Sequence, residues 1–180
     1  MKKIIGLVGQ IASGKGTVAE YLEKNCHAST YRFSTILRDV LDRLHTEKTR
    51  KNLQDISTVL RQKFGEDLLA KVMAEDVKKD SGDLIVVDGI RRMADIKYLK
   101  KLENFILISI EADPRIRYNR LIKRSENHGD NKKTFDDFLN DQKKEADAEI
   151  PIVIQNAHAK INNDGDFENL YKQIKQLINL

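Results

Sequence analysis

The sequence predicts an α/β fold, a three-layer α/β/α sandwich built on a five-stranded parallel sheet. Two observations support this prediction. Short apolar runs alternate along the chain with segments of helical periodicity, which is the order of right-handed strand–helix–strand units. The first apolar run also leads directly into a glycine-rich loop and a helical pattern, as the first unit of such a sheet would. Because ligands of parallel sheets bind beyond the carboxyl ends of the strands, we expect the functional residues at that edge.

The individual elements follow from the spacing of apolar residues. Strands that are buried on both faces read as apolar runs, and we expect strands at residues 3–8, 29–33, 84–89, 105–110 and 158–162. Helical stripes are expected at about residues 15–24, 34–44, 53–64, 66–79, 93–102, 114–124, 134–139 and 167–178. Ser34 fits a helix N-cap, and so does Asp113, which precedes Pro114 at the first helical position. Residues 151–154 look extended.

Composition limits the class of protein. A chain of 180 residues is long enough to bury a core as a single domain, residues 1–180. The one cysteine, Cys26, allows no intramolecular disulfide, and no Cys/His cluster has zinc spacing. No apolar run reaches the length of a membrane span, so we expect a cytoplasmic protein without membrane contact. The net charge of +4 is mixed along the chain, so nucleic-acid binding is not required.

The first loop carries a pattern that is specific for phosphate binding. Residues 9–17 read Gly-Gln-Ile-Ala-Ser-Gly-Lys-Gly-Thr between a predicted strand and a predicted helix. Glycines let the backbone turn its N–H groups inward, and the positive end of the helix points to the same place. An ordinary glycine-rich turn would not need the lysine and the hydroxyl residue. We therefore expect a nucleotide's phosphates to contact Gly9, Ala12, Ser13, Gly14, Lys15, Gly16 and Thr17, with Lys15 at the β- and γ-phosphates.

One position departs from the common form of this motif. Gly16 stands where Ser or Thr usually ligates Mg²⁺, and the hydroxyl comes one residue later, at Thr17. The Gly-Lys-Gly-Thr variant resembles the loop of adenylate-kinase-like nucleotide kinases, which belong to the P-loop NTPase fold. The resemblance implies that Thr17 contacts the phosphates and that Mg²⁺ is held largely through water. Asp88, at the end of an apolar strand, is the second expected Mg²⁺ residue, although a strand-terminal Asp alone is common in turns.

The arginines indicate where a phosphorylated substrate would bind. All eleven lie between Arg32 and Arg124, and their planar guanidinium groups suit bidentate phosphate contacts. Arg120 and Arg124 share a helix face, and the polar loop and charged helix after them resemble the lid region of nucleoside monophosphate kinases. That resemblance implies that Arg120 packs on the ATP base and that Arg124 contacts phosphates. For Arg115 and Arg117 we expect an ordinary solvated face.

Three further segments resemble acceptor-binding motifs of the same family. Residues 33–38 resemble its Ser-Thr-Gly-Asp-x-x-Arg segment without the Gly and Asp, which implies acceptor contacts from Thr35 and Arg38. Residues 88–92 resemble Asp-Gly-Phe-Pro-Arg, with Arg92 as the motif's arginine and Arg91 in place of its proline, so either arginine could bind the acceptor. Residues 50–65 resemble the acceptor-side insert of deoxynucleoside monophosphate kinases, which implies roles for Gln54 at the base and for Arg61.

The C-terminal segment, residues 157–165, resembles an element of dephospho-CoA kinases in which His158 replaces an Asp. The resemblances together imply ATP- and Mg²⁺-dependent transfer to a nucleoside or deoxynucleoside monophosphate. Lys15, Arg92 and Arg124 would be catalytic. The single domain would contain a helical acceptor-binding insert (about 34–80) and a lid (about 120–149). Dephospho-CoA kinase is the first alternative, and a nucleotide-dependent switch or ATPase without a small acceptor is the second. The sequence leaves four points open: the base of the acceptor, its sugar, the donor (ATP or GTP) and the oligomeric state (a monomer or a weak dimer).

Overall fold

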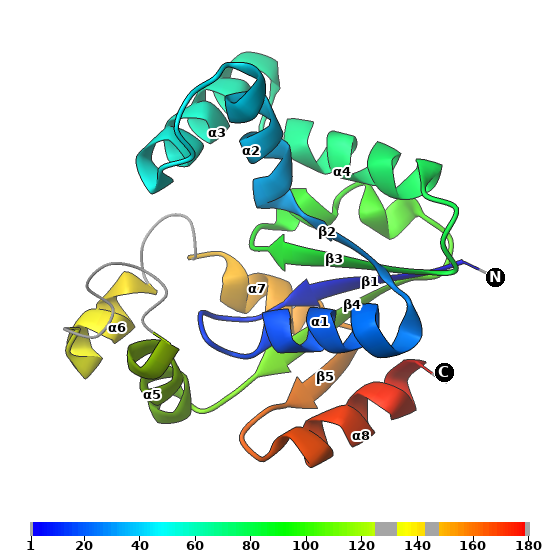
Figure 1. Cartoon of the computed structure of the whole chain (residues 1–180), viewed down its shortest axis with the longest axis vertical. Coiled ribbons are helices and arrows are strands. Elements are labelled where there is room, and N and C mark those ends of the chain that lie inside the picture. Colours follow the sequence, from blue (N-terminus) through cyan, green and yellow to red (C-terminus); the bar gives the residue numbers. More distant parts are fainter. Residues whose placement is uncertain (1, 125–132, 143–147, 179–180) are drawn as a thin grey trace.

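The computed structural model describes residues 2–124, 133–142 and 148–178. Five strands form one sheet in the order β2-β3-β1-β4-β5, and every neighbouring pair is parallel (Figure 1). The strands are β1 (Lys3–Val8), β2 (Ser29–Arg32), β3 (Leu84–Ile90), β4 (Phe105–Glu111) and β5 (Ala159–Asn162). The predicted fold class and all five strands are therefore confirmed.

Helices cover both faces of this sheet. The described α-helices are α1 (Lys15–Cys26), α2 (Phe33–Arg43), α3 (Arg50–Phe64), α4 (Leu68–Lys79), α5 (Pro114–Arg124), α6 (Phe135–Asp141), α7 (Ile150–Gln155) and α8 (Phe167–Ile178). Two short 3₁₀ helices, η1 (Met93–Ile96) and η2 (Leu99–Lys101), follow β3. Among the described helices, none is long and apolar enough to cross a membrane.

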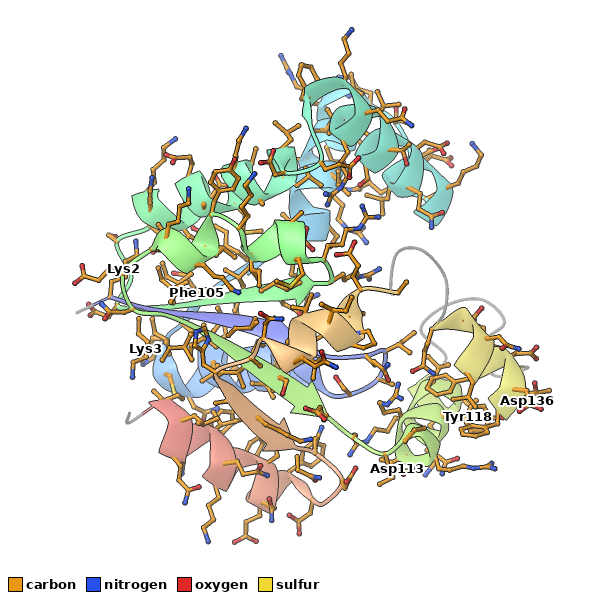
Figure 2. All side chains as sticks on the ribbon, turned by 180° about the vertical axis from the view of Figure 1, so that it is seen from behind. Lys2, Lys3, Phe105, Asp113, Tyr118 and Asp136 are labelled. Carbon is orange, nitrogen blue, oxygen red and sulfur yellow. The ribbon has the colours of Figure 1, made fainter. Side chains whose placement is uncertain are left out.

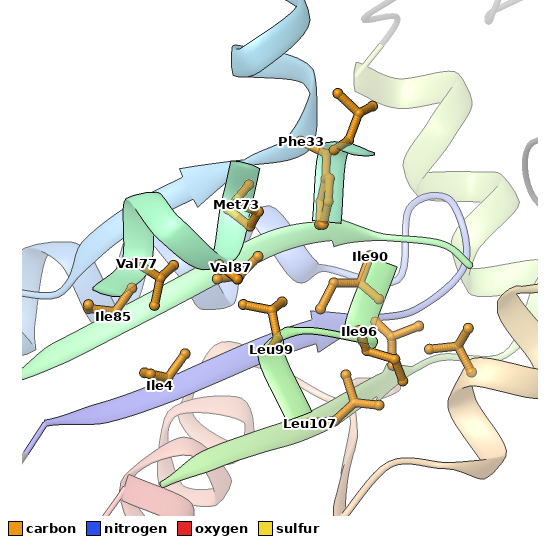
Figure 3. Close-up of a cluster of buried hydrophobic side chains, with 14 of the residues drawn as sticks. Ile4, Phe33, Met73, Val77, Ile85, Val87, Ile90, Ile96, Leu99 and Leu107 are labelled. Carbon is orange, nitrogen blue, oxygen red and sulfur yellow. The ribbon is translucent and has the colours of Figure 1, made fainter. Parts of the chain in front are cut away.

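The two faces of β1 lead to two separate clusters of buried side chains. Ile4 and Val8 face the cluster that contains Met73 of α4 and Leu99 of η2 (Figure 3). Ile5 and Leu7 face the other cluster, which α1 and α8 cover. Because a strand turns successive side chains to opposite faces, burial on both sides requires an apolar residue at nearly every position. The unbroken apolar run in the sequence has this cause.

Three local predictions are wrong. The segment predicted as one helix over 93–102 forms η1 and η2 instead of an α-helix. Residues 151–154, predicted as extended, lie inside α7, where Pro151 occupies the first turn and Ile150 and Val153 are buried on one face. Helix α2 begins at Phe33 with Arg32 as its N-cap residue and without a side-chain cap, so Ser34 is not its N-cap.

Two helical units stand beside the β1–α1 loop, one on each side (Figure 1). One unit is α2 with α3. The other is α5 with α6, joined by an aromatic cluster in which the Tyr118 ring lies 5.4 Å from that of Phe135 and 5.8 Å from that of Phe138. Figure 2 shows Tyr118 between these two helices, seen from behind. The loop that follows the carboxyl end of β1 therefore lies between two helical units.

Candidate active site

The β1–α1 loop approaches its neighbours so closely that two of its glycines are sterically required. A Cβ on Gly9 would lie 2.3 Å from the carbonyl oxygen of Ile110. A Cβ on Gly14 would lie 2.1 Å from Nδ2 of Asn163, and Gly14 also has a φ of 103°, in the left-handed region. The spacing of these glycines, read from the sequence, thus reflects two physical contacts at the carboxyl edge of the sheet.

Two polar groups at this loop lack the usual hydrogen-bond partner: the N-terminus of α1 has no side-chain cap, and the Ser13 hydroxyl has no acceptor or donor beside it among the described residues. Helix α1 begins at Lys15 with Gly14 as its N-cap, so no side chain caps its first turn. The Oγ atom of Ser13 is buried, and it has no hydrogen-bond partner among the described residues. Buried hydroxyls are normally hydrogen-bonded, and an uncapped helix N-terminus favours an anion. Both features fit a phosphate group bound in the loop.

Lys15 and Thr17 begin the first turn of α1. The Nζ atom of Lys15 donates to the carbonyl oxygens of Gly9 (2.7 Å) and Gln10 (3.1 Å). The ammonium group therefore lies against the start of the loop in which it is predicted to contact the nucleotide's phosphates. Thr17 is half-buried and Gly16 is exposed.

Arg117 of α5 contradicts the prediction of a solvated position. Its side chain is buried, and its Nη1 atom donates to the carbonyl oxygen of Ile11 in the loop (3.3 Å). Burial lowers the pKa of its guanidinium group, and the negative charge of Asp113 opposes that shift. One indication that Arg117 is buried was present in the sequence. It lies four residues before Leu121, so the two residues share one face of the helix, and Leu121 is also buried.

Asn163, in the loop after β5, supports the phosphate-binding loop from a second direction. Its Nδ2 atom donates to the carbonyl oxygen of Ser13 at 2.8 Å, and the side chain is buried. Arg120 of α5 holds the same residue, because its Nη2 atom donates to the carbonyl oxygen of Asn163 (2.8 Å). The Nη1 atom of Arg120 is buried and has no partner among the described residues. Arg124 ends α5, and its side chain lies outside the described residues.

Asp88 lies within β3, where it is paired in register with Arg32 of β2. The Nε atom of Arg32 lies 3.2 Å from Oδ2 of Asp88, and Oδ1 of Asp88 accepts from the backbone N–H of Gly89 (2.7 Å). The same guanidinium group reaches the phosphate loop, since Nη2 lies 3.9 Å from the position of a Cβ on Gly16. Sequence reasoning did not assign Arg32 to the site, because its place beside Asp88 depends on the strand order.

The segment after β3 is organised around a buried carboxylate, Asp95. Its Oδ2 atom accepts from the backbone N–H groups of Arg91 and Arg92, each at 3.0 Å. Its Oδ1 atom lies 3.4 Å from Nη2 of Arg61, and the side chains of Asp95 and Arg61 are only 5% and 11% exposed. Arg92 lies 3.5 Å from a carboxylate oxygen of Glu66. Two of the predicted acceptor arginines are therefore engaged with acidic side chains, and Asp95 was missed.

The remaining predicted acceptor residues lie on the surface. Thr35 and Arg38 are exposed on α2, Gln54 is exposed on α3, and Arg91 is exposed at the end of β3. The family motif places its arginine six residues after its serine, whereas Arg38 comes four residues after Ser34. Thr35 and Arg38 therefore cannot both match that motif in one register.

Comparison with known proteins identifies the family and the fold. A family model described as an AAA domain matches residues 5–155. The chain belongs to the AAA domain family. It is 27% identical to a UPF0200 protein of Saccharolobus solfataricus over 178 residues, which covers 97% of this chain and 92% of that protein. A UPF0200 protein of Thermococcus gammatolerans is 29% identical over 180 residues and covers 97% of this chain and 93% of its own length.

A solved structure has the same fold. Shikimate kinase from Bacteroides thetaiotaomicron superimposes with a TM-score of 0.64 over 98% of this chain and 97% of its own, at 14% sequence identity. This AAA-domain chain therefore shares the fold of a P-loop kinase.

Proposed function

We propose that the chain transfers a phosphoryl group from ATP to a small phosphorylated acceptor, a nucleoside or deoxynucleoside monophosphate. The phosphate-binding loop carries this proposal. It offers an uncapped helix N-terminus, the ammonium group of Lys15 and a buried, unpartnered hydroxyl on Ser13. Catalysis of phosphoryl transfer consists mostly of positioning and charge neutralisation, and these groups supply both for the donor nucleotide.

Mg²⁺ fits the same edge of the sheet. Asp88 offers a carboxylate that is 13% exposed, and Thr17 offers a hydroxyl in the first turn of α1. The cation would neutralise charge on the nucleotide's phosphates, and it binds through few carboxylates and several waters. Arg32 acts as the counter-ion of Asp88 in this structure and would have to release that carboxylate.

Basic side chains on the other side of the loop support a phosphorylated acceptor. Arg38 on α2 and Arg91 after β3 are exposed, Arg61 of α3 is paired with Asp95, and Arg92 is paired with Glu66. The attacking phosphate oxygen of a monophosphate is already ionised, so no general base is needed. In this proposal residues of about 34–80 form the acceptor-binding insert, and residues of about 120–149 form the lid, of which 125–132 and 143–147 lie outside the described residues.

Dephospho-CoA kinase is the second candidate because the segment resembling that family folds directly onto the phosphate loop through Asn163. Its acceptor is a hydroxyl group, which needs a carboxylate base. Asp88 is the carboxylate that the sequence predicts at this edge of the sheet, and it is already paired with Arg32 at 3.2 Å. The monophosphate hypothesis needs Asp88 for Mg²⁺ alone, whereas a hydroxyl acceptor would need a carboxylate base as well, and we prefer the monophosphate for this reason.

The test is ADP release from ATP–Mg²⁺ in the presence of ribo- and deoxyribonucleoside monophosphates and of dephospho-CoA. We expect one monophosphate to stimulate turnover. Lys15→Ala should lower kcat by about 10²–10³-fold, the loss seen when one group that stabilises transition-state charge is removed. Lys24→Ala, on the same helix in an exposed pair with Glu20, is the control and should retain full activity. Hydrolysis that no acceptor stimulates would refute the proposal, and stimulation by dephospho-CoA would replace it with the second candidate.

A further inference from the structure

Arg117 combines burial, a positive charge and contacts to three separate segments. Only 3% of the residue is exposed. Its Nε atom donates to the carbonyl oxygen of Ala112 (3.0 Å), and its Nη1 atom donates to those of Ile11 (3.3 Å) and of the Gln142 side chain (2.9 Å). The guanidinium group also packs over the ring of Phe138, 5.3 Å from its centre. All three hydrogen-bond acceptors are neutral carbonyl oxygens.

The contact with Ile11 fixes the direction of an N–H group in the phosphate loop. The carbonyl of Ile11 and the N–H of Ala12 belong to one trans peptide unit, so they point in opposite directions. Arg117 draws that carbonyl toward α5 and thereby turns the Ala12 N–H away from α5. Asn163 acts in the same way on the Ser13–Gly14 peptide, two peptide units further along the loop. It holds the carbonyl of Ser13 and thereby orients the N–H of Gly14. Alternate peptide units of the loop are thus held from outside.

The backbone of Ala12 gives a second, independent sign that this peptide is held in place. Ala12 has a φ of 59°, in the left-handed region that costs a residue with a Cβ roughly 1–2 kcal/mol. Such a conformation persists only where the surroundings enforce it, and it is concentrated at ligand-binding sites. The strained residue and the residue that Arg117 holds are neighbours in the chain. Arg117 therefore contributes to enforcing the conformation.

We infer that Arg117 is a positioning residue for nucleotide binding: it orients the Ala12 N–H toward a phosphate without touching the nucleotide. The inference rests on the proposed function only in requiring that the loop binds a nucleotide. The contacts with Gln142 and Phe138 of the α6 segment fasten the guanidinium group at its other end. Loss of Arg117 should release the Ile11–Ala12 peptide while Asn163 still holds the Ser13–Gly14 peptide.

Arg115 provides a matched control on the same helix. Its guanidinium group stacks on Phe135 of α6 at 3.9 Å from the ring centre, but the residue is exposed. Arg115→Met removes a positive charge and an aromatic contact with α6, as Arg117→Met does. Only Arg117→Met also removes the hydrogen bond to the loop.

The experiment is a titration of the ¹⁵N-labelled protein with ADP, followed by amide NMR. In the wild-type protein we expect large shifts of the Ala12 and Gly14 amides on binding. Arg117→Met should lose the Ala12 shift, keep the Gly14 shift and weaken ADP affinity by about tenfold or more, the size expected for a charge-assisted hydrogen bond. Arg115→Met should behave as wild type. Gln142→Leu, which removes the hydrogen bond between Gln142 and Arg117 but not the one to Ile11, should keep both shifts.

Hydrogen exchange of the Ala12 amide in the nucleotide-free protein gives a readout that needs no ligand, and Arg117→Met should accelerate it. If the wild-type protein fails to bind ADP, the proposed function fails, and the exchange rates alone decide the role of Arg117. If Arg117→Met does not fold, Arg117→Gln replaces it, because its amide keeps a donor in the site. An unchanged Ala12 shift in a folded variant, or an equal loss in Gln142→Leu, would overturn the inference.

Discussion

The protein holds the phosphate loop and the arginines of the proposed acceptor side in different ways. Buried side chains from α5 and from the loop after β5, Arg117 and Asn163, support the phosphate loop. On the other side, Arg38 and Arg91 are exposed, while Arg61 and Arg92 are engaged with acidic residues. The proposed donor side is therefore held by buried hydrogen bonds in the absence of a ligand, whereas the proposed acceptor side keeps its charges paired or in solvent. Such a difference favours a tightly bound donor and an acceptor site that changes on binding.

The largest expected effect is the loss of stability in Asp95→Ala, which tests whether Asp95 organises the proposed acceptor side. The change leaves the guanidinium of Arg61 buried without its carboxylate and removes the acceptor for two backbone N–H groups. Breaking a buried ion pair from one side costs about 3–5 kcal/mol, and we expect a loss of this size in the free energy of unfolding. Urea unfolding followed by circular dichroism measures this loss.

Asp55→Ala is the control. It breaks an exposed pair with Lys51 on α3 and should lower the free energy of unfolding by less than about 1 kcal/mol. Equal losses would mean that Asp95 does not organise the acceptor side.

An intermediate effect is expected from Arg38→Ala, which tests whether the two sides bind separately. If Arg38 binds only the acceptor's phosphate, the KM of the acceptor should rise by about ten- to a hundredfold, and the Kd of ATP should not change. Steady-state kinetics and calorimetric titration give the two values. Arg43→Ala, at the exposed end of the same helix, should change neither value. A weaker affinity for ATP in Arg38→Ala would show that the two sides are not independent.

The smallest effect concerns Asp67, which joins the N-terminus of α4 to the segment after β3. Hydrogen bonds from Lys97 and Tyr98 hold the pKa of Asp67 well below its usual range. A carboxylate with a depressed pKa stabilises the fold above its unfolded-state pKa of about 4, and this contribution is lost as the pH falls below that value. The stability difference between wild type and Asp67→Asn should therefore be constant from pH 7 to about pH 5 and shrink below about pH 4.

Unfolding experiments across this pH range measure that difference. Tyr98→Phe removes one of the two donors, so it should give a smaller difference with the same pH dependence. A difference that does not change with pH would mean that Asp67 acts through packing rather than through its charge.

The sequence predicted the parts of this molecule that depend on local pattern. Apolar runs located the strands because burial on both faces leaves no polar alternation. The glycine spacing located the phosphate loop because a side chain at Gly9 or Gly14 would collide with a neighbouring residue. The sequence did not predict the roles of Arg117 and Asp95, since their burial depends on which helix or loop packs above them. Helix α7 was missed although Pro151 at its first turn and the spacing of Ile150 and Val153 were visible, because six residues are too few for a convincing period.

The hydrogen bond between Asn163 and Ser13 joins residues that are 150 positions apart in the chain. The phosphate loop is encoded near the N-terminus, but one of its peptides is oriented only after β5 has docked on β4 at the edge of the sheet. Contacts of such long sequence separation form late in folding, because the chain between them must first be ordered. A chain emerging from the ribosome would therefore carry the complete loop sequence without a finished nucleotide site. In refolding, recovery of nucleotide binding should follow recovery of helical signal, so bound nucleotide reports that the whole sheet has assembled.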